Sequence, residues 1–211
     1  MFQDFWANKL EKLYAQQNWA GKPSLFAQTA ATFMPSKGKF LELGAGVGQD
    51  SSYFGGLGYQ VTATDFTTAM LDQLNDGSYE VQFVDMQRLL PFEDAAFNVA
   101  YAHLSLHYFD YKTTEQLFGE IYRVLKPGGI LACLTNSTDD PEYRQGEQLE
   151  PDFYAVEGIQ KRFFDTDAVA NFARAFKPLL VDNQGTTYKD EAKGVHNLIR
   201  YVGQKESDVT G

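Results

Sequence analysis

The stretch that decides the fold is Lys39-Phe40-Leu41-Glu42-Leu43-Gly44-Ala45-Gly46-Val47-Gly48-Gln49-Asp50. An apolar run with an acidic residue near its end gives way to glycines at alternate positions, and an amphipathic run follows. This pattern predicts a strand, a tight turn and a helix. Glycine adopts positive φ angles and has no Cβ atom, so a ligand can lie against the backbone of the turn. The free N–H groups of the following helix would point at that ligand.

The spacing of the glycines indicates which ligand fits. A dinucleotide-binding turn has the pattern Gly-x-Gly-x-x-Gly, whereas here the third glycine comes one position earlier and Gln49 stands in its place. The carboxylate of Glu42 would repel a diphosphate and would suit a cationic group. These two residues argue against a dinucleotide. A glycine-rich turn in some other α/β fold remains the structural alternative.

The stretch resembles motif I of the class I S-adenosylmethionine-dependent methyltransferases, Asp/Glu-x-Gly-x-Gly-x-Gly. In that family the loop cradles the methionine part of the cofactor, and the acid, here Glu42, faces its ammonium group. The resemblance therefore implies S-adenosylmethionine as cofactor and S-adenosylhomocysteine as product. The loop residues that it implies in cofactor binding are Gly44, Ala45, Gly46 and Gly48.

The second and third predicted strands also end in acidic residues. Asp65 ends the run 59–65, and an acid at this place in nucleoside-binding α/β folds accepts hydrogen bonds from both ribose hydroxyls. We expect Asp65 and neighbouring Phe66 to bind the cofactor; a helix cap over 67–74 is the compatible alternative for Asp65. Asp85 and Met86 follow the third strand and match the adenine-binding positions of the resembled family. An aspartate that caps its own turn is the alternative there.

Histidines mark the acceptor side of the predicted sheet. His103 falls at the carboxyl end of the fourth predicted strand, where ligands bind in open α/β sheets. We take it as a cofactor contact and as the first candidate for a general base. His196, at the start of the last predicted strand, is the second candidate, and a structural role is the alternative for both. His107 matches a histidine that usually packs in the resembled family. No metal site is expected.

Composition narrows the function classes. The 211 residues predict one domain, 1–211, and the net charge of −10 disfavours a nucleic-acid substrate. The single cysteine, Cys133, excludes an intrachain disulfide and is expected inside a strand. With no signal peptide or apolar membrane span visible, we expect a cytoplasmic monomer or homodimer that does not bind membranes.

Two segments flank the predicted sheet. Residues 1–35 are expected to form two helices, one over 2–20 and one from Pro23 or Ser24 to about Met34, with Tyr14 and Trp19 as candidates for a cofactor lid. Residues 136–160 show no periodicity and are rich in acids. We expect a long loop there. It is either a substrate-side lid or a solvated acidic segment.

The alternation of strands and helices predicts an α/β fold. The resemblance implies a doubly wound seven-stranded sheet, order 3-2-1-4-5-7-6, with strand seven antiparallel and helices on both faces. It covers residues 36–135 most closely and includes the helix stop Lys126-Pro127-Gly128-Gly129. Asn98 departs from the family pattern, which has Asp there. The expected activity is in-line methyl transfer to a small molecule. A cofactor-binding or scaffold protein without turnover and an NAD-dependent oxidoreductase are the rival functions.

Overall fold

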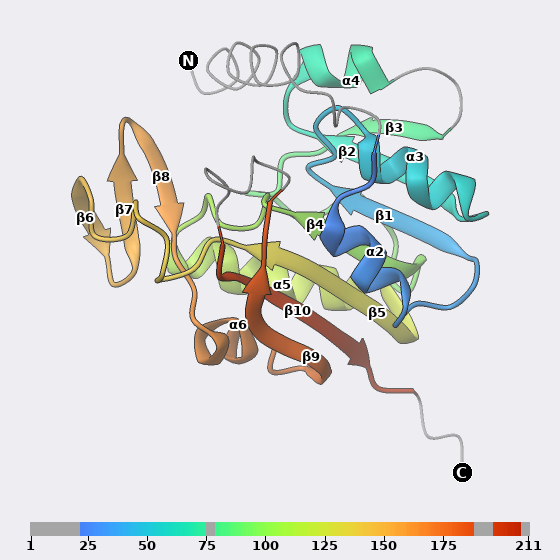
Figure 1. Ribbon diagram of the computed structural model, residues 1–211. Coiled ribbons are helices and arrows are strands. Elements are labelled where there is room, and N and C mark those ends of the chain that lie inside the picture. The colour runs from blue at the N-terminus through green and yellow to red at the C-terminus, as the bar shows by residue number, and fades with distance from the viewer. Residues whose placement is uncertain (1–21, 75–78, 188–195, 208–211) are drawn as a thin grey trace.

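A seven-stranded mixed sheet forms the centre of the protein (Figure 1). The structure is a computed structural model, and it describes residues 22–74, 79–187 and 196–207. The strand order is β3-β2-β1-β4-β5-β10-β9, and only β10 runs antiparallel to its neighbours. This confirms the predicted order, with β9 and β10 as the predicted strands six and seven. The strands are β1 (Lys39–Leu43), β2 (Gln60–Asp65), β3 (Glu80–Phe83), β4 (Phe97–His103), β5 (Leu125–Thr135), β9 (Phe176–Gly185) and β10 (Leu198–Lys205).

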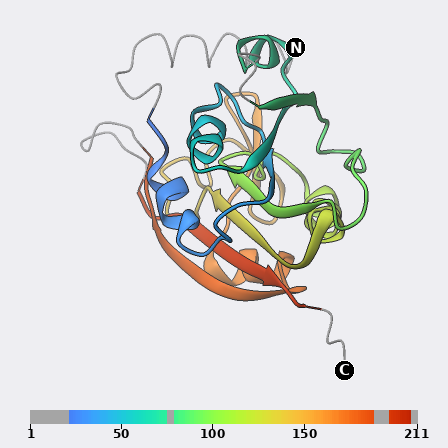
Figure 2. The ribbon, with the colours of Figure 1, turned by 90° about the vertical axis from the view of Figure 1, so that its right-hand side faces the viewer.

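Helices cover both faces of the sheet, as predicted (Figure 2). Alternate residues of each strand point to opposite faces, so Phe40 and Val99 pack on one side while Leu41 and Ala100 pack on the other. The first side carries α2 (Leu25–Ala31), α3 (Gln49–Gly56) and α4 (Thr68–Leu74). The second side carries α5 (Tyr111–Val124) and α6 (Thr166–Phe172).

Short polar side chains set the helix starts. Ser24, Asp110 and Asp165 each accept a hydrogen bond from a backbone N–H in the first turn of α2, α5 and α6. The helix ends were predicted less well. The second predicted helix ends at Ala31 rather than near Met34, because the amides of Phe33 and Met34 bond to carbonyls three residues back, which tightens the last turn. The predicted N-terminal helix over 2–20, with Tyr14 and Trp19, lies outside the described residues.

The helix stop at Lys126-Pro127-Gly128-Gly129 is a bulge in a strand rather than a separate turn. Strand β5 begins at Leu125, directly after α5, and Leu125 pairs with Phe97. The register then shifts before Val99 pairs with Ile130, and Gly128 has a φ of +77°. Glycine suits this position because the extra residues of a bulge need unusual backbone angles.

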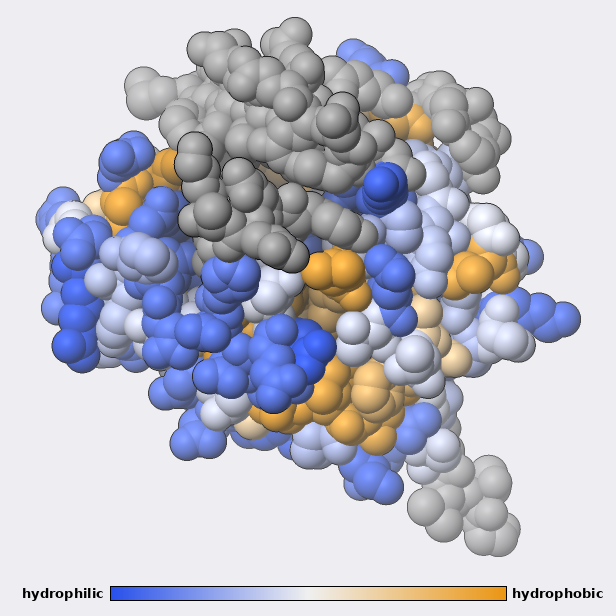
Figure 3. Space-filling view, viewed as in Figure 1, coloured by the Kyte–Doolittle hydropathy of each residue, from blue (hydrophilic) through white to orange (hydrophobic). Residues whose placement is uncertain are grey.

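The expectation of an unstructured loop over 136–160 is wrong. This segment contains most of a three-stranded antiparallel sheet, β6 (Glu147–Glu150), β7 (Phe153–Val156) and β8 (Ile159–Arg162). Glu157 and Gly158, at φ +51° and +82°, join β7 to β8 in a tight turn. The outer surface over this small sheet is largely hydrophilic (Figure 3). Four-residue strands with polar positions leave too short a pattern to detect from sequence.

Candidate active site

The glycine loop between β1 and α3 lies at the carboxyl edge of the sheet. Gly44, Gly46 and Gly48 have φ angles of +76°, +56° and +77°, which favour glycine. The amides of Gly44 and Ala45 both donate to the carbonyl oxygen of Thr64, at 2.9 and 2.8 Å. A Cβ atom on Gly44 would lie 2.5 Å from the Cβ of Ser105. Packing against β2 and the loop after β4 therefore requires this glycine, independently of any ligand.

Asp65 joins the glycine loop to the end of β2. Its two carboxylate oxygens accept hydrogen bonds from the amides of Gly46, at 3.0 Å, and Thr67, at 2.8 Å. Burial raises the pKa of Asp65, because its desolvation outweighs these hydrogen bonds. Asp65 therefore contacts the glycine loop directly, and its bond to Thr67, the residue before α4, lies next to the helix start named in the cap alternative.

Glu42 lies beneath the loop with its side chain almost fully buried. The hydroxyl of Ser51, in the first turns of α3, donates to its carboxylate. Burial raises the pKa of Glu42 well above its ordinary value, and the nearby charge of Asp50 raises it further. Burial thus disfavours the charged form of Glu42, and a cation placed beside it would favour ionisation.

Asp50 anchors a buried polar network that the sequence did not reveal. Its carboxylate accepts from the amide and hydroxyl of Ser24, at 2.6 and 2.8 Å, and from the hydroxyl of Tyr101, at 2.7 Å. These partners come from α2 and β4, far apart in the chain, so no spacing pattern connects them. The network fixes the start of α2 against the first turn of α3 and places a second carboxylate near Glu42.

The predicted adenine-binding residues follow β3. Asp85 accepts from the amide of Gln87 at 3.0 Å and pairs with Arg88 at 3.3 Å, so it stabilises its own turn as the alternative stated. Met86 extends toward the glycine loop, with its Cε 3.9 Å from the position of a Cβ on Gly44. The ring of Phe66 lies 5.5 Å from that of Phe83 at the end of β3.

Both predicted catalytic histidines lie at the same sheet edge. His103 ends β4 and is half-buried, and burial lowers its pKa, which keeps the imidazole neutral near pH 7. His196 is exposed and lies two residues before the start of β10, near which Ile199 pairs with Thr135 of β5. Because β10 is antiparallel, its start lies beside the carboxyl end of β5, as predicted.

His107 is more deeply buried than either of them, with 2% of its surface exposed. Its Nδ1 atom has no hydrogen-bond partner among the described residues, although its backbone carbonyl accepts from the amide of Arg162 at 2.7 Å. Burial lowers the pKa of His107 to about 3, and the positive charge of Lys161 contributes. His107 is thus buried, as expected of a histidine that packs, but its Nδ1 atom has no hydrogen-bond partner in the described part of the chain.

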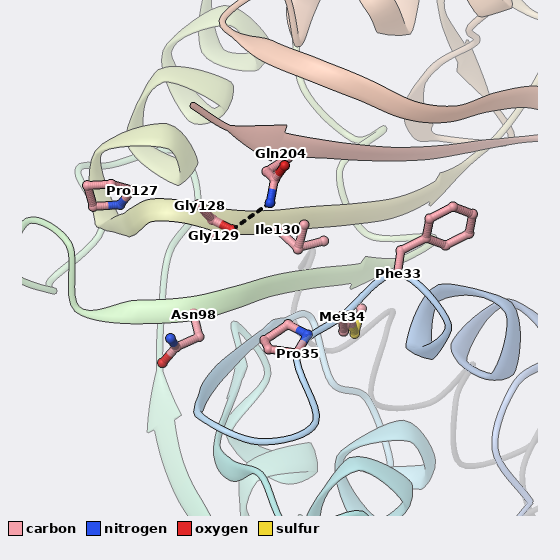
Figure 4. Close-up of a pocket in the computed structure, with 9 residues that line it drawn as sticks. All are labelled: Phe33, Met34, Pro35, Asn98, Pro127, Gly128, Gly129, Ile130 and Gln204. Carbon is pink, nitrogen blue, oxygen red and sulfur yellow. Dashed lines mark hydrogen bonds between the residues drawn. The ribbon is translucent and has the colours of Figure 1, made fainter. Parts of the chain in front are cut away.

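Two further features lie away from this edge. Cys133 is fully buried in β5 as predicted, and burial raises the pKa of its thiol to about 12, which makes it a poor nucleophile. A cavity of about 330 Å³ lies near the amino ends of β4 and β5, lined by residues that include Asn98 and Ile130 (Figure 4). None of the predicted site residues lines it. Among the described residues, no helix combines the length and apolar character needed to cross a membrane.

Comparisons with known proteins show what the chain resembles. Residues 41–133 match the family model described as "Methyltransferase domain". A malonyl-[acyl-carrier protein] O-methyltransferase of Enterobacter lignolyticus is 30% identical over 63% of this chain and 53% of its own length. The corresponding Salmonella typhimurium protein is 25% identical over 80% of this chain and 68% of its own length. The chain thus spans about half the length of the first of these relatives.

Solved structures share the fold. A Burkholderia thailandensis 1,6-didemethyltoxoflavin-N1-methyltransferase, solved with S-adenosylhomocysteine, has a TM-score of 0.74 at 18% identity, covering 98% of this chain and 88% of that one. The sheet order and this structural likeness show the fold, and residues 41–133 match a methyltransferase domain.

Proposed function

We propose that this protein transfers a methyl group from S-adenosylmethionine to a small-molecule acceptor and releases S-adenosylhomocysteine. The observation that carries the proposal is the direct bond from the amide of Gly46 to Asp65, which puts the glycine loop in contact with the acid at the end of β2. The family match over residues 41–133 supports the same activity.

The residues present fit this cofactor. Each carboxylate oxygen has two lone pairs, so Asp65 can keep its bonds to Gly46 and Thr67 while also accepting from two ribose hydroxyls. Glu42 would lie toward the ammonium group, which would favour its ionised form. Asp85 and Met86 would meet the adenine, because they follow β3 beside the loop.

The chain contributes mainly orientation and exclusion of water. When bound, S-adenosylmethionine supplies an electrophilic methyl group on a sulfonium. The residues at the sheet edge hold the acceptor atom in line with that methyl group, which replaces a bimolecular encounter by a fixed geometry. An acceptor that keeps its proton at neutral pH needs a base, and neutral His103 is the first candidate, followed by His196.

The names of the curated relatives suggest the first acceptor to test. They are malonyl-[acyl-carrier protein] O-methyltransferases. A malonyl carboxylate is already ionised near pH 7, so its oxygen needs no base before it attacks the methyl group. We propose a malonyl thioester as the first acceptor to examine for this chain.

The test is formation of S-adenosylhomocysteine from S-adenosylmethionine, first with malonyl-coenzyme A and then with a metabolite extract. We expect product formation by the unaltered protein and strongly reduced formation by Asp65→Ala. Binding of S-adenosylhomocysteine without turnover on any acceptor would instead favour a cofactor-binding or scaffold role. Absence of both binding and turnover would contradict the proposal.

A further inference from the structure

Two cations are buried among the described residues, and both lie on β8. Lys161 and Arg162 are 9% and 4% exposed. A buried charge is costly unless it is paired and hydrogen-bonded, so each needs an explanation. Their place is informative, because the amide of Arg162 bonds to the carbonyl of His107 in the loop that follows β4. This contact ties β8 to the carboxyl edge of the main sheet.

Arg162 has a complete set of structural partners. Its guanidinium donates to the carbonyls of Phe109 and Pro151, at 3.2 and 3.3 Å, and pairs with Glu150 at 2.6 Å. Its charge also lies over the ring of Phe153, 5.1 Å from the ring centre. These contacts hold the small sheet to the rest of the protein and account for the burial of Arg162.

Lys161 is different, because its ion pair within the described part of the chain is with a partly exposed carboxylate. It pairs with Tyr154 across β7 and β8, on the face of the small sheet where Tyr154, Val156 and Phe163 form an apolar cluster. Its ammonium group has three N–H donors, and Glu142 is the carboxylate that pairs with it in the described part of the chain. Glu142 is 45% exposed and comes from a turn, so water can solvate it when another carboxylate takes its place on Lys161.

His107 supplies a second feature at β8, because its backbone carbonyl bonds to the amide of Arg162, the residue after Lys161. Its Nδ1 is buried without a partner, and a buried polar atom of this kind usually meets a protein group, water or a ligand. The charge of Lys161 is felt at His107, which is neutral near pH 7. A neutral imidazole can carry its proton on Nδ1 and donate one hydrogen bond to an anion.

We propose that Lys161 and His107 form a subsite for a carboxylate group of the acceptor, and that Glu142 occupies Lys161 in the free protein. The inference rests on the proposed methyltransferase function and names the acceptor class. The protein carries a net charge of −10, so an anionic acceptor needs a local cation to offset general repulsion. Lys161 provides that local cation. When the carboxylate of the acceptor replaces that of Glu142, the buried ammonium group of Lys161 stays paired.

The test uses two thioesters that differ in one carboxylate, malonyl-coenzyme A and acetyl-coenzyme A. Each is titrated into the protein saturated with S-adenosylhomocysteine. We expect at least about tenfold tighter binding of the malonyl compound, from hydrogen bonds to charged groups. Lys161→Met keeps the volume and removes the charge, so it should lose this preference. Glu142→Gln is the matched control, because it frees the lysine and should keep or increase the preference.

If Lys161 and Glu142 form only a structural ion pair, the charge of Lys161 has no effect on the preference between the two thioesters. Equal binding of the two thioesters by the unaltered protein, or a preference that survives Lys161→Met, would overturn the subsite. Should Lys161→Met not fold, the decision falls to Glu142→Gln, whose loss of preference would overturn it. The initial titration with S-adenosylhomocysteine reports on the proposed function separately, and the thioesters can be titrated into the free protein if that ligand does not bind.

Discussion

At the scale of single residues, the buried Glu42 and the partly buried Asp65 are the central acids of the candidate cofactor site. Asp65 and Glu42 could be found from sequence because each stands at or near the end of an apolar strand, next to the glycine loop. The direction of their pKa shifts could not be predicted from sequence. The pKa of each depends on burial, and that of Glu42 also depends on Asp50 and Ser51, which no local pattern connects to it.

Glu42 predicts a pH dependence of cofactor affinity. Its pKa in the free protein is raised above the ordinary value of 4.5, so a cationic ligand group must displace its proton. We expect affinity for S-adenosylhomocysteine to increase with pH above the ordinary value until the raised pKa is passed, by at most about tenfold per pH unit for one proton. Calorimetry across pH measures this, and Glu42→Gln should remove the slope. A slope unchanged in Glu42→Gln would show that Glu42 is not the coupled group.

The same raised pKa has a consequence for stability. The folded protein binds the Glu42 proton more tightly than the unfolded chain does, so the proton stabilises the fold. We expect this contribution to decline as pH rises from the ordinary value through the raised folded-state pKa. Urea unfolding across this range should show a smaller decline for Glu42→Gln than for the unaltered protein. An identical decline in both proteins would contradict the raised pKa of Glu42 in the folded protein.

Asp65→Ala separates the ribose role from the turn role. The substitution removes acceptors for Gly46 and Thr67, so stability should fall by about 1–2 kcal/mol in either case. If Asp65 also binds ribose, cofactor affinity should fall by about 2–3 kcal/mol, or roughly 30- to 150-fold. Asp65→Asn is the control and should lose less, since an amide oxygen still accepts. Unchanged affinity with reduced melting temperature would leave Asp65 with the turn role alone.

At the scale of elements, the glycine loop and the small sheet show what local sequence does and does not determine. Glycines at alternate positions identify the loop because few other turns need them. Gly44 must be glycine because Ser105 lies against it. This contact joins the segments that follow β1 and β4, and sequence spacing does not reveal it. The small sheet was missed because its four-residue strands and tight turns leave no clear period, and its attachment depends on the distant pairing of Arg162 with the His107 backbone.

Gly44→Ala tests the loop against a matched glycine. Gly44 and Gly58 both have positive φ, +76° and +94°, so alanine costs about 1 kcal/mol or more at either site. Only at Gly44 does the new Cβ meet another residue, Ser105 at 2.5 Å, whereas nothing lies within 4 Å of it at Gly58. We expect Gly44→Ala to lose cofactor affinity and more stability than Gly58→Ala. Equal losses in both variants would remove the packing constraint assigned to Gly44.

Arg162→Met tests the anchoring of the small sheet. Removing this buried cation leaves Glu150 and two backbone carbonyls without their donor, which should cost about 3–5 kcal/mol. Arg174→Met is the control, because Arg174 is 60% exposed and its pair with Glu115 should contribute at most about 1 kcal/mol. Urea unfolding of both variants measures the difference. Similar values for the two would mean that Arg162 does not hold the small sheet in place.

At the scale of the whole molecule, the strand order and the edge that carries the candidate site were predictable from sequence. Strand-end residues Glu42, Asp65 and His103 reach one edge because parallel strands β1, β2 and β4 all end there. The burial of the two cations of β8 could not be predicted, because nothing in the local sequence distinguishes Lys161 and Arg162 from basic residues on the surface.

The most direct measurement of the central claim is a calorimetric titration of the full chain with S-adenosylhomocysteine and, separately, with NAD. The glycine spacing and Glu42 predict that S-adenosylhomocysteine binds with a dissociation constant in the micromolar range, about −8 kcal/mol, and that NAD does not bind. Tighter binding of NAD, or no binding of S-adenosylhomocysteine, would contradict the account.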